Sequence, residues 1–338
     1  MKQAIVDVVI IGGGPAGLYA TFYGGLRELS VTVLEATEVL GGKINFYPEK
    51  FVWDIGALPP SLGREVRANL IKQAQTFNPN IFLNSKACQI NKVDDFFHVS
   101  DEQGRIHVCR AVLFAIGGGV VAPKKLSAEI ADEVSDMIHY AFPNRQAITG
   151  KRLVVSGGGD AAVEYATQCL EYAAEVFIFY RGEKLKALEA SVAKFKKNGG
   201  QFVLNTTIQE VRQGSSHHME LVTDQELFHA DHLLVQHGYN RDGSLLDELS
   251  FALTKEDDFY LYCEEPTCTN IPGLFAAGDV QFSKGKLYLL AGAFQDAATS
   301  INQIKHYLDP QSHQRGMVSS HNHKFDELNQ ELFNQLSE

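Results

Sequence analysis

The sequence predicts an α/β protein in which a strand–turn–helix unit occurs twice. Residues 5–18 and 151–164 each start with a short β-branched apolar run, pass through a glycine cluster, and end in small residues that favour a helix. Each segment is followed by a second apolar run, at residues 31–34 in one case and 176–179 in the other. Two strands joined by a helix in this way open a Rossmann-like nucleotide-binding fold, so we expect two such domains.

Length and composition fit two globular domains. The chain has 338 residues, of which 45% are hydrophobic and 21% charged, and this balance excludes a disordered or low-complexity protein. The net charge of -11 argues against a broad nucleic-acid-binding surface, which would need a basic stripe. No apolar run reaches the roughly 18 residues of a membrane span. Five cysteines, an odd and sparse set, form no disulfide framework, so we expect a reducing cytoplasm.

The order of the remaining segments indicates that one domain is inserted into the other. A turn, a short buried strand and an acidic residue follow one another at 271–279, and small and apolar side chains at helical spacing occupy 287–307. A pair of antiparallel strands is predicted at 96–99 and 106–108. The expected division is a discontinuous first domain at 1–119 and 245–338, and a second domain at 120–244.

The first glycine cluster has the spacing of a dinucleotide-binding turn. In Gly12-x-Gly14-x-x-Gly17, one glycine allows the tight turn, one lets the backbone approach a pyrophosphate, and one lets helix and strand pack closely. The helix that follows offers unpaired N–H groups and a partial positive charge to the phosphates. Glu35, at the end of the next strand, can accept hydrogen bonds from both ribose hydroxyls. The alternative, a glycine-rich turn beside a surface glutamate, is disfavoured by the strand and helix context.

Residues near this turn favour FAD as the ligand. Gly42 and Lys43 would bring backbone close to a flavin, and the aromatic side chain of Tyr47 can stack on the flavin ring. Late in the chain, Asp279 follows Gly278, and its carboxylate can bind the ribityl chain. Two plainer interpretations stay open, namely that Tyr47 is a packed core aromatic and that Asp279 caps a turn.

The second glycine cluster differs from the first at the end of the following strand. Gly157-x-Gly159-x-x-Ala162 is the same fingerprint, with alanine at the third place as a permitted variant. Where the first segment has its acidic residue, this segment has Tyr180, and Arg181 comes next. An acid there would repel a 2′-phosphate, whereas an arginine can bind one through two hydrogen bonds.

A second cation strengthens the preference for NADPH over NADH. Lys186 follows Arg181 in the same loop and can add a positive charge beside the 2′-phosphate. The alternative is a solvated basic loop that also contains Lys184. Of these two interpretations, we favour a 2′-phosphate site and therefore NADPH.

A redox-active disulfide is not predicted. Such chemistry needs two thiols close together, usually as CxxC or CxxxxC, and the chain has no CxxC. Cys263 and Cys268 have the longer spacing but lie far from either glycine turn in sequence, so a structural role is favoured. We expect Cys88, Cys109 and Cys169 to be buried small hydrophobic residues. No histidine or cysteine cluster has metal-ligand spacing, so no metal site is predicted.

Six stretches of sequence are informative when taken together. They are residues 11–17 (IGGGPAG), 23–27 (YGGLR), 40–43 (LGGK), 47–50 (YPEK), 157–160 (GGGD) and 275–279 (FAAGD). With these motifs the chain resembles the thioredoxin-reductase-like ferredoxin–NADP reductases of bacteria, over nearly its whole length. The resemblance implies two three-layer ββα Rossmann-like domains with thioredoxin reductase architecture and no cysteine pair. It also implies a homodimer, with noncovalent FAD in the first domain and NADP in the second.

The resemblance assigns residues to each cofactor, and none as a catalytic acid or base, because the cofactors supply the chemistry. It implies that Tyr47 stacks on the flavin and that a C-terminal residue covers it, with His321 the best match and His323 its rival. The residues implied for FAD are Gly12, Gly14, Pro15, Ala16, Gly17, Glu35, Lys43, Tyr47, Cys88, Val121, Asp279 and Ser320. The residues implied for NADP are Gly157, Gly159, Asp160, Ala162, Arg181 and Lys186.

The expected activity is electron transfer between NADPH and ferredoxin or flavodoxin through FAD, by hydride transfer to flavin N5 and then one-electron steps. Ferredoxins are usually acidic, so docking on this acidic chain calls for a local basic patch. Lys284 and Lys286 are candidates for that patch, and a solvated turn is the equal alternative. Two other functions stay open: a reductase of quinones or ferric chelates, and a non-catalytic flavin-binding sensor.

Overall fold

The computed structural model describes residues 5–214, 218–242, 244–313 and 316–336. The chain divides into two compact units. The first unit comprises Met1–Ile44, Phe51–Val120 and Arg241–Glu338, and the second comprises Asn45–Lys50 and Val121–Asn240. The second unit is therefore inserted into the sequence of the first.

The segment Asn45–Lys50 joins the second unit, although the sequence analysis assigned it to the first domain. Its contacts explain why. The hydroxyl of Tyr165 donates a hydrogen bond to the carbonyl of Phe46 at 2.9 Å, and the guanidinium of Arg145 donates to the carbonyl of Glu49, also at 2.9 Å. These partners are far apart in sequence, so no local sequence pattern could predict the contacts.

A mainly parallel sheet forms the centre of the first unit, in the order β5-β2-β1-β8. The last part of β8 pairs in parallel with β22. Its first part pairs antiparallel with β7, as the sequence predicted for 96–99 and 106–108, and β7 pairs in turn with β6. Ile11 lies in register with Leu34 and Phe114, so three strands end together where the first glycine cluster begins. The strands are β1 (Val6–Ile11), β2 (Val31–Leu34), β5 (Asn80–Phe82), β6 (Ala87–Val93), β7 (Phe96–Asp101), β8 (Ile106–Phe114) and β22 (Leu274–Ala276).

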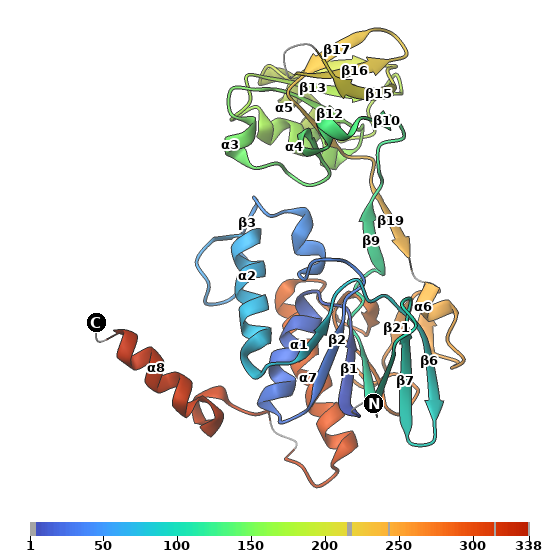
Figure 1. Cartoon of the computed structure of the whole chain (residues 1–338), viewed down its shortest axis with the longest axis vertical. Coiled ribbons are helices and arrows are strands. Elements are labelled where there is room, and N and C mark those ends of the chain that lie inside the picture. Colours follow the sequence, from blue (N-terminus) through green and yellow to red (C-terminus); the bar gives the residue numbers. More distant parts are fainter. Residues whose placement is uncertain (1–4, 215–217, 243, 314–315, 337–338) are drawn as a thin grey trace. The chain divides into compact units, whose positions relative to one another are not determined.

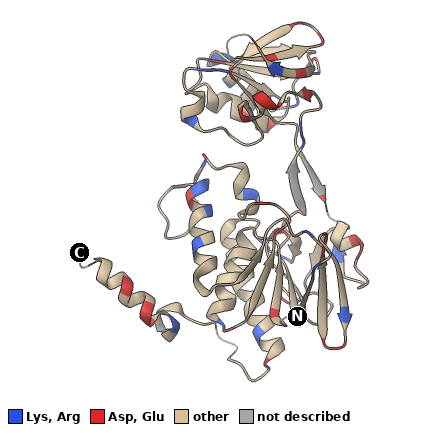
Figure 2. Cartoon of the chain, viewed as in Figure 1, with Lys and Arg blue, Asp and Glu red and all other residues tan. Residues whose placement is uncertain are grey.

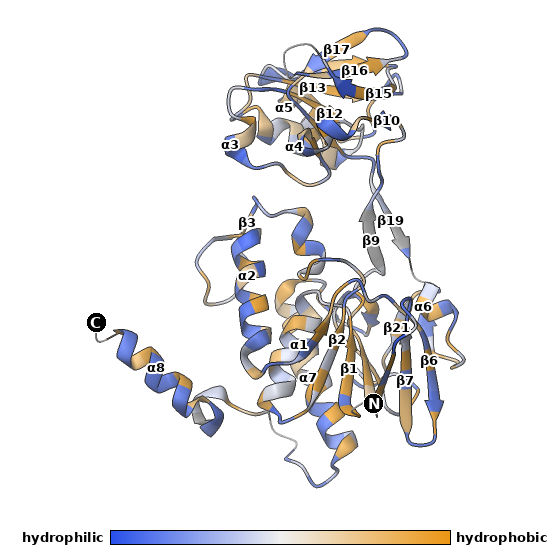
Figure 3. Ribbon diagram, in the orientation of Figure 1, coloured by the Kyte–Doolittle hydropathy of each residue, from blue (hydrophilic) through white to orange (hydrophobic). Residues whose placement is uncertain are grey.

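Two helices cover one face of this sheet. Helices α1 (Pro15–Leu26) and α7 (Leu290–Leu308) lie side by side against it, and α7 confirms the helix expected at 287–307 (Figure 1). On the other face, Phe97 and Phe114 are fully buried, and each such side chain stabilises the fold by about 1.5–3 kcal/mol. Figure 2 shows no charge on β2, and Figure 3 shows that strand as mainly hydrophobic, as a strand buried on both faces requires.

Shorter elements complete the first unit. Among them is the three-stranded sheet β20-β21-β23, whose strands come in sequence between the second unit and α7. The helices are α2 (Gly63–Ala74), α6 (Ser244–Asp247) and α8 (Asp326–Leu336). The remaining strands are β3 (Phe51–Val52), β4 (Ser61–Leu62), β20 (Lys255–Glu256), β21 (Tyr260–Tyr262) and β23 (Gln281–Phe282).

The second unit repeats the same plan around the parallel sheet β11-β18-β12-β13-β14. Ser156 is in register with Phe179 and Val235, so the strands beside the second glycine cluster also end together. The strands of this sheet are β11 (Ile138–His139), β12 (Arg152–Ser156), β13 (Glu175–Tyr180), β14 (Gln201–Leu204) and β18 (His232–Val235).

Helices and a small second sheet sandwich this parallel sheet. One buried cluster joins it to the helices, and another joins it to the sheet β10-β15-β16-β17, which gives the three layers of a ββα domain. The helices are α3 (Arg145–Ile148), α4 (Asp160–Cys169) and α5 (Glu189–Lys197). The strands of the second sheet are β10 (Glu129–Ile130), β15 (Ile208–Gln213), β16 (Met219–Thr223) and β17 (Leu227–Ala230).

Two of the places where the chain changes from one unit to the other lie in β9 (Val120–Pro123) and β19 (Tyr239–Asp242), which pair as a two-stranded sheet. Among the helices that the structure describes, none is both long and apolar enough to cross a membrane.

Candidate functional site

The first glycine loop (residues 12–17) is shaped by close backbone contacts. A Cβ atom on Gly12 would lie 2.4 Å from the carbonyl oxygen of Ala115, and one on Gly17 would lie 1.9 Å from the carbonyl oxygen of Gly12. Gly12 also has φ +109°, a conformation that favours glycine. By contrast, a Cβ on Gly14 would meet nothing nearer than Gly42 at 3.7 Å. The loop is therefore tight toward the sheet and open on the side where a pyrophosphate would bind.

Glu35 is fixed beside this loop. Its Oε2 accepts a hydrogen bond from the N–H of Gly13 at 2.7 Å, and its Oε1 accepts from the N–H and the hydroxyl of Thr37, both at 2.8 Å. The residue is buried, so these hydrogen bonds hold the carboxylate in one orientation. Because each carboxylate oxygen can accept two hydrogen bonds, Oε2 keeps one position for a ribose hydroxyl.

Three further segments meet the first glycine loop. The ammonium of Lys43 lies 2.8 Å from Oδ2 of Asp279, across a separation of 236 residues. A Cβ on Gly278 would lie 2.9 Å from the Cβ of Ala16, and one on Gly118 would lie 3.8 Å from Nζ of Lys43. The structure thus brings Lys43 and Asp279 to the first glycine loop, together with a glycine turn after β8 that the sequence analysis missed.

The C-terminal segment lies elsewhere in the first unit. The N–H of Met317 donates to the hydroxyl of Tyr23 at 3.0 Å, and the side-chain amide of Asn322 donates to the carbonyl of Leu26 at 3.3 Å. Both acceptors belong to the last turn of α1, which at about 1.5 Å per residue is roughly 18 Å long. Met317 and Asn322, on either side of Ser320 in sequence, are therefore anchored at the end of α1 opposite the first glycine loop, and the structure does not bring this segment to the other predicted FAD residues.

The remaining residues predicted for FAD have mixed placements. Tyr47 is half-buried within the segment that belongs to the second unit. Cys88 is partly exposed rather than fully buried, and its thiol donates to the carbonyl of Ser100 at 3.4 Å. The side chains of Val121 and His321 lie outside the part of the chain that the structure describes.

The second glycine loop (residues 157–162) has the same tight turn. A Cβ on Gly157 would lie 2.4 Å from the carbonyl oxygen of Gln236, and 3.1 Å from the Cβ of Ala162. This spacing lets alanine stand at the third place of the fingerprint. A Cβ on Gly159 would meet nothing within 4 Å, so this loop, like the first, is open at the second glycine of the fingerprint.

The loop after β13 folds back on the second glycine loop. The N–H of Lys186 donates to the carbonyl of Gly158 at 2.7 Å, and the N–H of Leu188 donates to Oδ1 of Asp160 at 2.8 Å. These hydrogen bonds hold the backbone of Lys186 at the second glycine loop. Asp160 thus anchors the cationic loop, a role that the motif alone did not reveal.

Tyr180 takes the place that Glu35 has in the first unit. Its ring packs between Gly158 and Gly182, where added Cβ atoms would lie 2.4 Å and 2.8 Å from ring carbons. Arg181 is exposed beside it and, within the described ranges, has no ion-pair partner. An unpaired guanidinium next to an open glycine loop is suited to bind a phosphate.

His237 is a residue of this region that sequence reasoning missed. Its Nε2 lies 2.9 Å from the hydroxyl of Ser156, the residue that precedes the second glycine loop. Burial, together with the positive charge of Arg181, lowers the pKa of His237. Ligands of open α/β sheets bind where the strand order reverses, here between β12 and β18, and that rule is the signal that could have pointed to the residue after β18.

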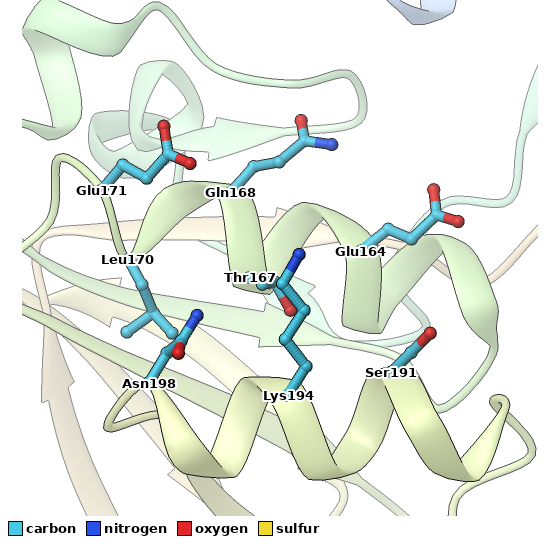
Figure 4. Close-up of a pocket in the computed structure, with 8 residues that line it drawn as sticks. All are labelled: Glu164, Thr167, Gln168, Leu170, Glu171, Ser191, Lys194 and Asn198. Carbon is cyan, nitrogen blue, oxygen red and sulfur yellow. The ribbon is translucent and has the colours of Figure 1, made fainter.

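A separate groove lies between α4 and α5 of the second unit (Figure 4). Its volume is about 570 Å³, and its lining is mainly polar. The residues of α4 that line it begin at Glu164, past the first turn of the helix, and none was predicted as a site residue. Figure 4 shows long polar side chains around an open surface rather than converging on one point.

The buried cysteines are not activated as thiolates. Burial raises the pKa values of Cys109, Cys169 and Cys263 to about 12, which opposes thiolate formation at these positions.

Lys286 does not form an exposed basic patch with Lys284, because its side chain is only 4% exposed. Among the residues described, no group of three or more His, Cys, Asp or Glu side chains could hold a metal ion.

Comparisons with known proteins agree with this architecture. The family described as pyridine nucleotide-disulphide oxidoreductase matches residues 6–303. The chain is 38% identical to ferredoxin–NADP reductase 2 of Exiguobacterium sibiricum, with 99% of this chain and 98% of the relative covered. It is 40% identical to ferredoxin–NADP reductase 3 of Lysinibacillus sphaericus, with 98% and 97% covered.

Solved structures support the fold. The thioredoxin reductase of T. acidophilum matches with a TM-score of 0.63 at 22% identity, covering 92% of this chain and all of that one. The thioredoxin reductase of Lactococcus lactis matches with a TM-score of 0.62, also at 22% identity, covering 90% and 99%. These likenesses confirm the predicted α/β architecture of two Rossmann-like domains.

Proposed function

This chain belongs to the family of pyridine nucleotide-disulphide oxidoreductases, and from that premise we propose that it is an FAD-containing ferredoxin–NADP reductase. Its relatives at 38–40% identity over nearly the whole length carry that name. The observation that carries the proposal is the pair of open glycine loops with different residues beside them, a buried acid in the first unit and exposed cations in the second.

The first unit fits FAD. Helix α1 begins directly after Gly14, at the open part of the first glycine loop, and a helix N-terminus favours a pyrophosphate. Glu35 would bind the adenosine ribose, while Lys43 and Asp279 would exchange their mutual ion pair for contacts with the flavin and its ribityl chain. When bound, FAD accepts electrons in pairs from a nicotinamide and releases them singly.

The second unit fits NADPH. Arg181 and Lys186 would bind the 2′-phosphate, and Tyr180 would cover the adenosine side of the loop without presenting a repelling carboxylate. The proposal includes a cytoplasmic homodimer. Five free cysteines are compatible with a reducing compartment.

The acceptor is tested by direct comparison. NADPH-driven reduction of a ferredoxin, a flavodoxin, a quinone and a ferric chelate should be measured side by side with the purified FAD-loaded protein. We expect the ferredoxin or the flavodoxin to give the highest kcat/KM. Faster reduction of the quinone or the chelate would assign the chain to a different reductase class.

A rapid-mixing experiment separates an enzyme from a flavin-binding sensor. Mixing the yellow protein with NADPH should bleach the flavin absorbance on the timescale of turnover. Bleaching that is slow or absent would favour a sensor. A protein that stays colourless after incubation with FAD would refute both functions.

A further inference from the structure

Lys286 and Asp296 form a largely buried ion pair in the first unit. The ammonium of Lys286 contacts Oδ2 of Asp296 and donates a hydrogen bond to Oε1 of Gln281 at 3.0 Å. The two side chains are 4% and 17% exposed. Lysine is seldom buried to this extent unless it is paired, and an ion pair removed from water needs further hydrogen bonds to offset its desolvation.

One of those further hydrogen bonds leads to the candidate FAD site. The same Oδ2 atom of Asp296 accepts the N–H of Gly278 at 3.1 Å. Gly278 has φ +74°, and its Cα faces Ala16 so closely that an added Cβ would lie 2.9 Å from the Cβ of that residue. The turn that carries Asp279 is therefore held between the first glycine loop on one side and Asp296 on the other.

The geometry points to Lys286 and Asp296 as positioning residues for FAD, which fix the turn at Gly278 so that Asp279 presents its carboxylate to the hydroxyl-bearing chain of the flavin. This inference rests on the proposed function and adds two residues to it. Lys286 holds the carboxylate of Asp296 in one orientation, Asp296 holds the N–H of Gly278, and Asp279 then has one direction in which to accept hydroxyl groups.

Removing one partner should disturb the site more than removing both. In Lys286→Met, the carboxylate of Asp296 is left buried without its cation, which favours its rotation toward water and the release of Gly278. In the double variant Lys286→Met with Asp296→Asn, no unpaired charge remains, and the side-chain oxygen of asparagine can still accept the N–H of Gly278. In Lys286→Met with Asp296→Leu, the charge is gone and so is the acceptor.

The test is titration of the FAD-free protein with FAD, followed by flavin fluorescence. We expect Lys286→Met to raise the Kd for FAD about tenfold or more, because a charged hydrogen bond is lost at the turn. The Met/Asn double variant should return to within about threefold of wild type, while the Met/Leu variant should stay weak. Lys255→Met is the matched control, since Lys255 pairs with Asp247 at 3.0 Å in the same unit and should change the Kd by less than about twofold.

Two further readouts separate positioning from general stability. At saturating FAD, the visible spectrum of Lys286→Met should differ from wild type in band shape, and in the FAD-free protein the amides of Gly278 and Asp279 should exchange hydrogen faster. A wild-type Kd and spectrum in Lys286→Met would overturn the inference alone, as would equal weakening in both double variants. A wild-type chain that never binds FAD would overturn the proposed function and this inference with it.

Discussion

In the first unit Glu35 follows the strand beside the first glycine loop and accepts the N–H of Gly13, whereas in the second unit Tyr180 stands at the equivalent register and lays its ring on Gly158. The equivalence is exact in strand pairing, since Ile11 pairs with Leu34 just as Ser156 pairs with Phe179. The two loops share their backbone course but use different chemistry at one position. Packing against the sheet sets the path of the backbone in both loops. The residue that follows the neighbouring strand can therefore differ between the two units and decide which ligand binds.

The two loops differ again at the third place of the fingerprint. Gly17 approaches the carbonyl of Gly12 so closely that no side chain fits, while Ala162 is accommodated beside Gly157. The helix of the first unit therefore packs more tightly on its turn than the helix of the second. The following predictions use these differences, beginning with the largest expected effect.

Gly17→Ala should abolish FAD binding. The new Cβ would lie 1.9 Å from the carbonyl oxygen of Gly12, so the turn or the helix must shift. We expect the Kd for FAD to rise at least about a hundredfold, or the unit to lose its fold, because overpacking against backbone cannot relax. FAD titration and thermal unfolding measure both outcomes. The control is Ala162→Gly, which should cost only about 1 kcal/mol of helix stability and leave NADPH affinity unchanged.

Arg181→Ala should raise the KM for NADPH about tenfold to a hundredfold and change the KM for NADH little. The reason is that a charged hydrogen bond to the 2′-phosphate is lost, and NADH has no such group. Steady-state kinetics with both coenzymes measures the difference. Lys184→Ala is the control, because Lys184 pairs with Glu189 at 3.6 Å on the exposed side of the same loop. Equal changes for the two coenzymes would remove Arg181 from the 2′-phosphate site.

Glu35→Gln should weaken FAD binding about tenfold. Both carboxylate oxygens accept hydrogen bonds from N–H or hydroxyl groups, so an amide nitrogen at either place would face a donor. The measurement is the same FAD titration. In the second unit, Tyr180→Phe removes only a hydroxyl and should leave NADPH affinity near wild type. An unchanged Kd for FAD in Glu35→Gln would mean that the acid is not part of the ribose site.

Acid should destabilise the second unit before the first. Burial, with the nearby His232, lowers the pKa of His139 to about 4, and Nε2 of His139 lies 3.1 Å from Nδ1 of that neighbour. Because the folded pKa lies below the unfolded value near 6.5, this contribution to stability is present above about pH 6.5 and is lost as pH falls toward 4. The loss should be on the order of 1 kcal/mol between pH 7 and 5.

Hydrogen exchange read by mass spectrometry can follow each unit separately, which the single tryptophan cannot, because Trp53 belongs to the first unit. His139→Phe should flatten the pH dependence of exchange in the second unit. The same pH dependence in this variant as in wild type would show that other groups cause the acid sensitivity.

Local patterns predicted much of the fold. The β-branched runs before each glycine cluster predicted β1 and β12, and the glycine spacing predicted the turns, because strand period and turn geometry are properties of a few neighbouring residues. The hairpin β7-β8 and helix α7 were predicted in the same way. The exposure of Lys286 was predicted wrongly, since a lysine beside a glycine turn gives no local sign of a buried carboxylate partner.

The sequence by itself determined two α/β domains, two glycine loops and the acidic or cationic residue after each, because backbone conformation and side-chain chemistry are local. Only the tertiary structure decided that Lys43 meets Asp279, that Asp296 reaches Gly278, and that Tyr180 covers Gly158. These contacts depend on strand order and on how α1 and α7 pack on the sheet. That arrangement follows from the close packing of the whole core, which depends on residues from many parts of the chain, so no single stretch of sequence determines it.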